Sequence, residues 1–346
     1  MSDATQRNLP APIRYDPEHR VVAVTGACSV IGDGVIARLE QDRRYVRVVA
    51  LDVRKPDRPL NKTVFHKLDL TEPNAGARTA ELLERERVDT VLHAAFLARP
   101  TRAGAWAHEL EVIGTSSVLA ACAACRLHKV VLFALAQAYG AHPRNPNYLE
   151  ERHERRGMEG SRFFADKLEA ERMTERFAQE NPATLVTILR CAPILGPNAR
   201  NFVARYLSRP VAPVIMGYDP LVQLLHESDA IDAFMLCLDA DFRGTFNIAS
   251  DGVLPLSTLL ALAGRVAMPM PHGLAAPLSR LLWMTQVSTT PPTFLDFLRY
   301  LCVVDTERAR RVIGFEPRFD IRQTIAQFAG TEAAPAARAK LEERTR

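Results

Sequence analysis

The chain has 346 residues, of which 47% are hydrophobic, so it can fill the core of one large domain or two modest ones, and a disordered or collagen-like chain is excluded. Lysine and arginine exceed the acidic residues by only four, which does not indicate a nucleic-acid or membrane partner. Its longest apolar stretches are interrupted by Arg265 and Arg280, and residues 1–19 carry no signal-peptide core. We therefore expect a cytoplasmic protein with reduced cysteines.

Short apolar runs recur along the first 250 residues, at 20–25, 46–51, 63–68, 90–95, 129–134, 185–190 and 244–249. Their length and their β-branched residues are typical of strands buried on both faces. Amphipathic segments that predict helices lie between most of them, at 32–40, 75–87, 105–125 and 163–179. This alternation predicts an α/β fold of the Rossmann type, a doubly wound parallel sheet with helices on both faces.

The pattern also suggests how the chain is divided. We expect an N-terminal extension at 1–19 and a dinucleotide-binding domain at 20–195, whose sheet is completed by segments near 220–250. A smaller C-terminal substrate-binding cap should occupy most of 196–330, and a flexible tail should follow at 331–346. Within the cap, the apolar segment 274–301 is either core packing or a lid over a large apolar ligand. The pair Cys122 and Cys125 lies in an Ala-rich helical stretch with no second pair at zinc spacing, so we expect helix packing and no metal site.

The first strand runs into a glycine-containing turn and then a helix, in the sequence VVAVTGACSVIG of residues 21–32. Such a turn brings the backbone close to a pyrophosphate, whose charge then meets the amides at the helix N-terminus. Asp52 ends the second strand, 20 residues after Gly32, where its carboxylate would accept hydrogen bonds from a ribose. Together these features predict a dinucleotide site.

Further motifs follow in a characteristic order: Thr25-Gly26-Ala27, Asp69-Leu70-Thr71, His93-Ala94-Ala95, Gly114-Thr115, Tyr139-Gly140, Lys167, Leu189-Arg190, Pro193, Gly196-Pro197, His226 with Asp229, Asn247-Ile248-Ala249, and Asp305 with Gly314-Phe315-Glu316-Pro317. Through residues 20–328 the chain resembles the extended short-chain dehydrogenases/reductases related to sugar-nucleotide epimerases. It departs from the family pattern at Ser29, which replaces the middle glycine of the phosphate turn by another small residue.

The resemblance implies NADH or NADPH as cofactor, bound by Gly26, Cys28, Ser29, Val30, Ile31, Gly32, Asp52, Arg54, Asp69, Leu70, Ala94, Ala95, Phe96, Ala134, Lys167 and Pro193. The choice between the two stays open. Asp52 favours NADH because a carboxylate repels a 2′-phosphate, whereas Arg54 and Lys55 directly after it would suit NADPH.

In the resembled family a tyrosine four residues before the lysine moves the proton, and a serine or threonine near the fifth strand orients the carbonyl. Here those positions carry Phe163 and Leu135, and the family's usual asparagine is Glu111. Of the catalytic set only Lys167, the ribose anchor, remains. The general acid and the oxyanion donor it lacks typically contribute ~10²–10⁴-fold and ~10²–10³-fold.

The chain resembles atypical members of this family that lack the serine and tyrosine and reduce ketones of angucyclinone polyketides in antibiotic biosynthesis. The resemblance implies an NAD(P)H-dependent ketoreductase whose hydrophobic aromatic substrate, or water, supplies the proton. The predicted substrate contacts are Leu135, Gln137, Tyr139, Phe163, Asn198, Phe202, Trp283 and Met284. His142 and His153 are candidate substitute acids, although loop positions suit them better.

Two other interpretations stay open. One is a sugar-nucleotide epimerase or dehydratase with a non-standard acid/base, and the other is a non-catalytic NAD(P)-binding sensor. We expect a small hydrophobic molecule as the partner, and either a monomer or a homodimer.

Overall fold

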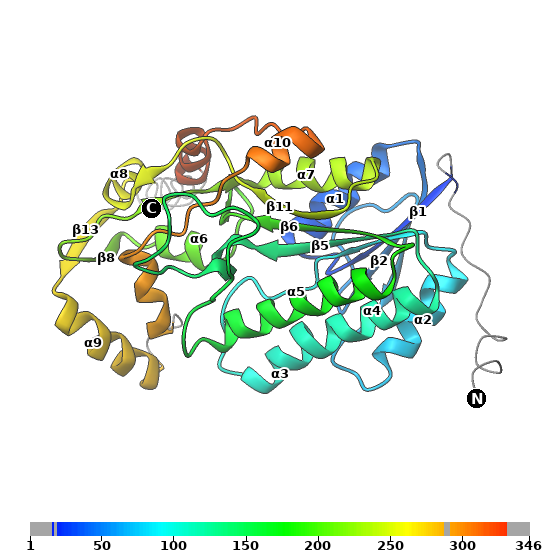
Figure 1. Cartoon of the computed structure of the whole chain (residues 1–346), viewed down its shortest axis with the longest axis horizontal. Helices are drawn as coiled ribbons and strands as arrows, with labels where there is room; N and C mark the ends of the chain where they lie inside the picture. Colours follow the sequence, from blue (N-terminus) through cyan, green and yellow to red (C-terminus); the bar gives the residue numbers. More distant parts are fainter. Residues whose placement is uncertain (1–15, 17–18, 287–290, 331–346) are drawn as a thin grey trace, which may run out of the picture.

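The central element is a seven-stranded parallel sheet (Figure 1). The computed structural model describes residues 16, 19–286 and 291–330. The strand order is β11-β6-β5-β4-β1-β2-β3. The strands are β1 (Arg20–Thr25), β2 (Tyr45–Asp52), β3 (Thr63–Lys67), β4 (Thr90–His93), β5 (Lys129–Leu135), β6 (Leu185–Cys191) and β11 (Gly244–Ile248). The predicted α/β fold is confirmed.

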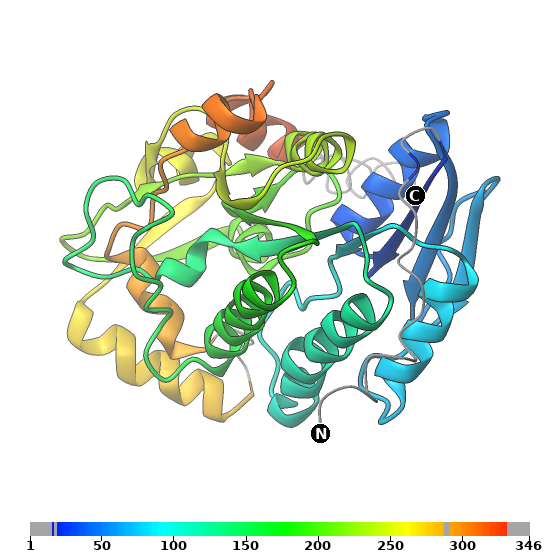
Figure 2. The same ribbon diagram turned by 45° about the vertical axis from the view of Figure 1, so that its right-hand side comes forward.

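Helices cover both faces of this sheet (Figure 2). One face carries α1 (Val30–Gln41) and α7 (Glu227–Asp239), which contact each other, with α10 (Glu307–Ile313) packed on the same core. The other face carries α2 (Ala75–Arg85), α4 (Gly114–Ala124) and α5 (Arg162–Glu180). Each layer buries the apolar side chains that alternate along the strands, which explains why the strand sequences are apolar on both faces.

The stretch expected to be one helix over 105–125 is helical but interrupted. It consists of α3 (Gly104–His108), a π-helical turn η1 (Glu109–Ile113) and α4. A π-turn inserts an extra residue into the helical ladder and changes the direction in which the side chains around it point. As expected, Cys122 and Cys125 are buried where α4 packs against α2.

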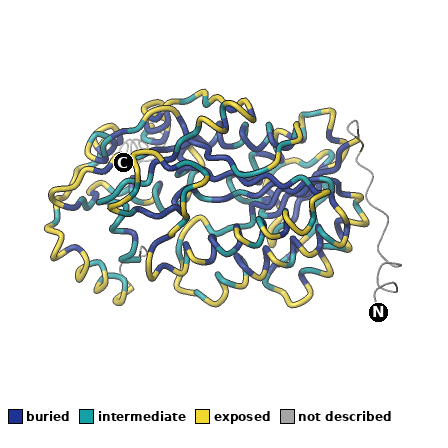
Figure 3. The backbone as a smooth tube through the Cα atoms, in the orientation of Figure 1, coloured by how far each residue is buried: buried dark blue, intermediate teal, exposed yellow. Residues whose placement is uncertain are grey.

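The cap forms the end of the molecule at the left of Figure 1. It is built from α6 (Phe202–Leu207), β8 (Val211–Ile215), α8 (Leu256–Leu262), β13 (Val266–Met270), α9 (His272–Met284) and the 3-10 helix η3 (Pro292–Leu298). Short strand pairs connect it to the main sheet: β7 (Ile194–Leu195) with β10 (Leu225–His226), and β9 (Leu221–Val222) with β12 (Leu254–Pro255). Figure 3 shows the contrast between the buried sheet and the exposed outer elements of the cap.

Some expectations fall outside this description. The predicted tail, 331–346, lies outside the described residues, as do 1–15 and 17–18 of the predicted extension. Within the described part of the chain, no helix combines the length and the apolar character needed to cross a membrane.

Candidate functional site

The turn between β1 and α1 depends on two glycines. Gly26 has φ +67°, and a Cβ there would lie 2.4 Å from the carbonyl oxygen of Ala94. A Cβ at Gly32 would lie 2.2 Å from the carbonyl oxygen of Gly26. Neither position therefore accepts a side chain without moving backbone. The result is a tight turn in which the N-terminus of α1 comes close to the carboxyl end of β1, as pyrophosphate binding requires.

Ser29 and Asp52 complete this turn. The Ser29 hydroxyl accepts a hydrogen bond from the Gly32 amide at 2.9 Å and so caps α1. The Asp52 carboxylate accepts one from the Cys28 amide at 2.9 Å and another from the Arg54 amide at 3.1 Å. Each of its oxygens keeps a further lone pair for a ribose hydroxyl. The predicted residues around the turn are thus brought together at the ends of β1 and β2.

The predicted residues after β4 lie at the same edge of the sheet, because β4 pairs with β1 in parallel. Ala94 is buried against the Gly26 turn, and the ring of Phe96 stands edge-on to His93 at 4.8 Å between centroids. His93 is bonded to Thr25 at 2.7 Å and to Thr115 at 3.0 Å, and its burial lowers the pKa to about 3. Its imidazole is therefore neutral and structural.

The predicted motif Asp69-Leu70-Thr71 follows β3 at the same edge of the sheet. Asp69 accepts hydrogen bonds from the amide and the hydroxyl of Thr71, which closes a short turn. Leu70 packs so closely on α4 that a Cβ at Gly114 would lie 3.0 Å from its side chain.

Lys167 and Glu111 form a buried ion pair next to the carboxyl end of β5. The Lys167 ammonium donates to Glu111 Oε1 at 2.9 Å, and the amide of Leu97 donates to the same oxygen at 2.8 Å. The ammonium also lies 4.7 Å from the ring centre of Phe163 and 5.2 Å from that of Phe96. Both distances are within cation–π range.

Burial raises the pKa of the Glu111 carboxyl, and the adjacent Lys167 ammonium offsets part of that rise. Glu111 Oε2 is buried and has no hydrogen-bond partner among the described residues. Glu111 lies on the π-helical turn η1, which aims its side chain at α5. The sequence shows Glu111 in place of the family's asparagine, but it did not lead us to predict the ion pair with Lys167. The acidic residue at position 111 was the only sequence signal for that pair.

Hydrocarbon surrounds the ammonium. Phe163, one helical turn before Lys167, packs its ring against those of Phe164, Phe202 and Phe294 at 5.1 to 6.2 Å. Leu135 and Ala134 line a narrow cleft together with Lys167. Phe163 and Leu135 therefore present apolar surface near Lys167.

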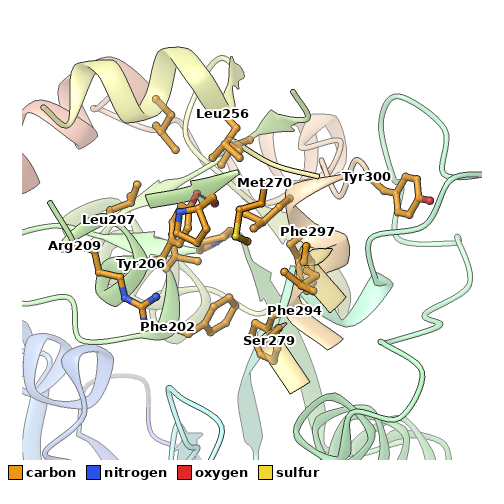
Figure 4. A pocket seen from close by; sticks show the side chains of 18 of the residues that line it. Phe202, Tyr206, Leu207, Arg209, Leu256, Met270, Ser279, Phe294, Phe297 and Tyr300 are labelled. Carbon is orange, nitrogen blue, oxygen red and sulfur yellow. Dashed lines mark hydrogen bonds between the residues drawn. The ribbon is translucent and has the colours of Figure 1, made fainter. Parts of the chain in front are cut away.

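The cap encloses a cavity of about 520 Å³ (Figure 4). Its walls are mostly apolar and come from every cap element: Phe202, Tyr206 and Leu207 of α6, Leu256 and Leu259 of α8, Met268 and Met270 of β13, Leu278 and Leu282 of α9, and Phe294 and Phe297 of η3. Gln137 and Pro193 bring the carboxyl ends of β5 and β6 into the same wall. This edge of the sheet also holds the predicted cofactor residues.

Two predicted substrate contacts, Gln137 and Phe202, line this cavity, as does Pro193, which was expected to contact the cofactor. Phe163 lies behind the wall against Phe202. The segment 274–301 contributes several lining residues, which fits a lid better than core packing alone. Other lining residues, Arg209 and Met270 among them, were missed because only the tertiary fold brings them together.

Four other predicted substrate contacts do not line this cavity. The hydroxyl of Tyr139 is buried between Asn247 at 3.0 Å and Arg190 at 2.6 Å. Asn198 donates to Glu227 at 2.8 Å. On α9, the Trp283 ring stacks on Arg102 at 4.4 Å and Met284 faces outward. The helix presents Leu278 and Leu282 inward instead, one helical turn apart.

The candidate histidines also lie elsewhere. His153 accepts a hydrogen bond from the Glu150 amide at 2.8 Å, and His142 contacts the Arg156 guanidinium at 3.3 Å. His226 caps α7 and packs on Phe319 at 4.1 Å. The cavity lining includes none of the three.

Comparison with known proteins decides the family. Residues 22–249 match the model of the NAD dependent epimerase/dehydratase family. The chain belongs to this family. It is 34% identical over 307 residues to the uncharacterized protein Rv0501 of Mycobacterium tuberculosis, covering 87% of this chain and 81% of that one.

Solved structures of the epimerase/dehydratase family share the fold. UDP-glucose 4-epimerase from Thermotoga maritima with UDP-glucose has a TM-score of 0.70 at 18% identity, covering 91% of this chain and 99% of that one. DesIV, the dTDP-glucose 4,6-dehydratase from Streptomyces venezuelae with NAD and TYD bound, has a TM-score of 0.72 at 16% identity, covering 92% and 98%. Family membership confirms the expected cofactor class, NAD(P). In the described part of the chain, no cluster of His, Cys, Asp or Glu could hold a metal ion.

Proposed function

We propose that this chain is an NAD(P)H-dependent reductase of ketones carried by large apolar molecules. The observation that carries the proposal is the mostly apolar cavity of about 520 Å³, whose wall includes Gln137 and Pro193 at the carboxyl ends of β5 and β6. Pockets of this size and lining suit drug-sized apolar ligands. An aromatic polyketide of the angucyclinone type, as in the simocyclinone pathway, is one such substrate.

The residues fit a nicotinamide dinucleotide. In this proposal the turn of Gly26 and Gly32 and the N-terminus of α1 bind the pyrophosphate, and Asp52 accepts hydrogen bonds from the adenosine ribose. Lys167, held by Glu111, donates to the nicotinamide ribose. Bound NAD(P)H supplies the hydride.

Proton delivery is the unusual part. Phe163 and Leu135 carry no exchangeable proton, so the carbonyl oxygen takes its proton from water or from a phenol of the substrate. These side chains instead place apolar surface beside the Lys167 ammonium and behind Phe202 of the cavity wall, next to the position proposed for the nicotinamide.

The test is oxidation of NADH or NADPH with a panel of polycyclic ketones, with and without a hydroxyl beside the carbonyl, next to UDP-glucose and dTDP-glucose. Turnover of the hydroxylated ketones alone would support the whole proposal. Equal activity on ketones without that hydroxyl would refute the substrate's role as acid. Cofactor binding without oxidation across the panel would favour a sensor.

A matched pair of variants addresses the cavity. Met270→Trp narrows it, whereas Leu262→Trp adds similar bulk to the exposed surface of α8. We expect Met270→Trp to raise KM for the ketone about 10-fold, which corresponds to ~1.4 kcal/mol, and Leu262→Trp to leave it unchanged. Neither variant should alter the Kd for NADH.

One observation favours a sugar-nucleotide substrate as the second candidate. The guanidinium of Arg209 lies in the cavity wall (Figure 4), where it would suit a diphosphate. Epimerisation or dehydration of either nucleotide sugar in the panel would replace the ketone proposal with this one.

A further inference from the structure

The end of the cap exposes large apolar side chains on three neighbouring elements. We call this surface the cap-end face and define it by Val211 and Met216 at β8, Val266 and Met268 on β13, and Leu274, Leu281 and Met284 on α9; of these, Val211 and Met268 also line the cavity. β8 and β13 are hydrogen-bonded neighbours, and Figures 1 and 2 show α9 at the same end of the molecule. Leu274, Leu281 and Met284 are 63%, 57% and 71% exposed, and Val266 is 64% exposed.

Exposed residues of this kind normally occur singly, and a group of them marks an interaction surface. Leu274, Leu278 and Leu281 recur at helical spacing along the outer side of α9. α9 is thus apolar on two sides, because Leu278 and Leu282 also line the cavity. Leu278 is exposed to solvent and also lines the cavity, so it lies at the mouth of the cavity.

Charge on the cap is one-sided. Residues 197–218 and 252–295 contain no aspartate or glutamate, although the chain has 40 acidic residues in 346. The same segments contain the five arginines 200, 205, 209, 265 and 280. Arg265 directly precedes β13, and Arg280 is exposed on α9. Two of these arginines therefore lie on or directly beside the elements that carry the cap-end face.

Two of the three acidic residues at the borders of these segments are paired with arginines outside them. Asp219 accepts hydrogen bonds from the amide and hydroxyl of Ser257, Asp251 pairs with Arg310, and Asp296 pairs with Arg299. The small net charge of the chain hides this local excess, because acidic residues elsewhere average it out.

We propose that the cap-end face docks on an anionic lipid bilayer, with α9 lying in the interface. Protruding aliphatic side chains bury in the acyl region while arginines meet lipid phosphates, and this combination is the one that holds amphipathic helices at membrane surfaces. The proposal replaces the expectation of no membrane partner. An acidic protein partner would match the arginines as well, but it would give no binding to anionic vesicles.

Docking in this orientation connects the bilayer to the cavity. β13 and α9 supply both the docking residues and part of the cavity wall, so an apolar molecule could pass from the acyl region at Leu278 without crossing water. This route rests on the proposed function, whereas the docking itself does not.

The experiment is co-sedimentation of the full chain, without cofactor or substrate, with vesicles of phosphatidylcholine alone or with about a third phosphatidylglycerol. The wild type should bind the anionic vesicles at least 5-fold more than the neutral ones, with binding reduced by salt. Leu281→Glu combined with Met284→Glu should lower the bound fraction at least 5-fold. Val46→Glu combined with Val312→Glu, two exposed apolar positions outside the cap, should not.

Three results would overturn the proposal. The first is a wild type that does not sediment with anionic vesicles. The second is an equal loss in both double variants. The third is a wild-type dimer in size-exclusion chromatography that the α9 variant converts to monomers without any vesicle binding, because a second copy would then cover the face. None of these outcomes involves turnover, so failure here leaves the ketone panel as an independent test.

Discussion

At the scale of single residues, the site depends on how the charge of Lys167 is held. An ammonium buried beside two aromatic rings is costly unless an anion accompanies it, and Glu111 is that anion. In its proposed role as ribose anchor, Lys167 needs a fixed position more than a particular pKa. Glu111, which lies on η1, fixes the position of the Lys167 ammonium, which extends from α5.

Lys167→Met tests this pairing through stability. The variant leaves Glu111 without the ammonium that offsets its desolvation, so the pKa of the carboxyl rises further above its unfolded value. A carboxyl with a raised folded pKa destabilises the fold only where it ionises. The loss in free energy of unfolding should therefore be small near pH 4 and grow to about 3 kcal/mol as the pH rises through the folded pKa. Urea unfolding at a series of pH values measures it.

The matched control is Glu111→Gln combined with Lys167→Met, which removes both charges. Its stability relative to the wild type should not fall further at neutral pH, because no ionisable group remains in the pair. A pH-dependent loss of equal size in this double variant would show that the pairing is not the cause of the effect.

At the scale of elements, the sequence predicted the main sheet almost completely, because buried parallel strands are continuous apolar runs that few other structures use. It predicted the extent of 105–125 but not its π-turn. The register of a helical ladder depends on packing against α5 and on the Glu111 pair, and neither leaves a periodic signal. The turn of Gly26 was recognisable because a glycine placed directly between a buried strand and a helix is typical of a phosphate-binding turn.

Gly26→Ala tests that turn against a control with the same backbone conformation. Gly26 and Gly264 both have φ +67°, but a Cβ at Gly264 would meet no atom within 4 Å, whereas at Gly26 it would meet backbone of the β4 segment. Gly264→Ala should cost only the left-handed strain, about 1–2 kcal/mol. Gly26→Ala should cost clearly more and should also abolish NADH binding, measured by urea unfolding and by fluorescence titration. Equal costs would mean that the close approach to Ala94 is unimportant.

At the scale of the whole molecule, the grouping of the residues of the proposed dinucleotide site was predictable, and the lining of the cap cavity was predictable only in part. The proposed dinucleotide site is built from short motifs at the ends of consecutive strands, so order along the chain indicates proximity in space. The cavity gathers residues from 137 to 302 whose contacts are set by the cap's own packing. Trp283 and Met284 show the limit: their residue types suit an apolar pocket, but the phase of α9 turns them away from it.

Because the proposed cofactor site and the cap cavity share residues, we predict that the cofactor and an apolar ketone bind cooperatively. Gln137 and Pro193 belong to the cofactor-binding edge of the sheet and also line the cap cavity, so a bound dinucleotide would order one wall of the pocket and cover part of its polar surface. We expect saturating NADH to lower the Kd of an apolar polycyclic ketone about 5-fold or more. Because binding free energies are reciprocal, the ketone must lower the Kd of NADH by the same factor. Calorimetric titrations in both orders measure the two factors, and Met270→Trp should weaken ketone binding while leaving the coupling factor unchanged, because Met270 lies on β13 and not on the shared wall. Two unchanged affinities would mean that the cavity and the cofactor site are separate, and the cap would then need another role.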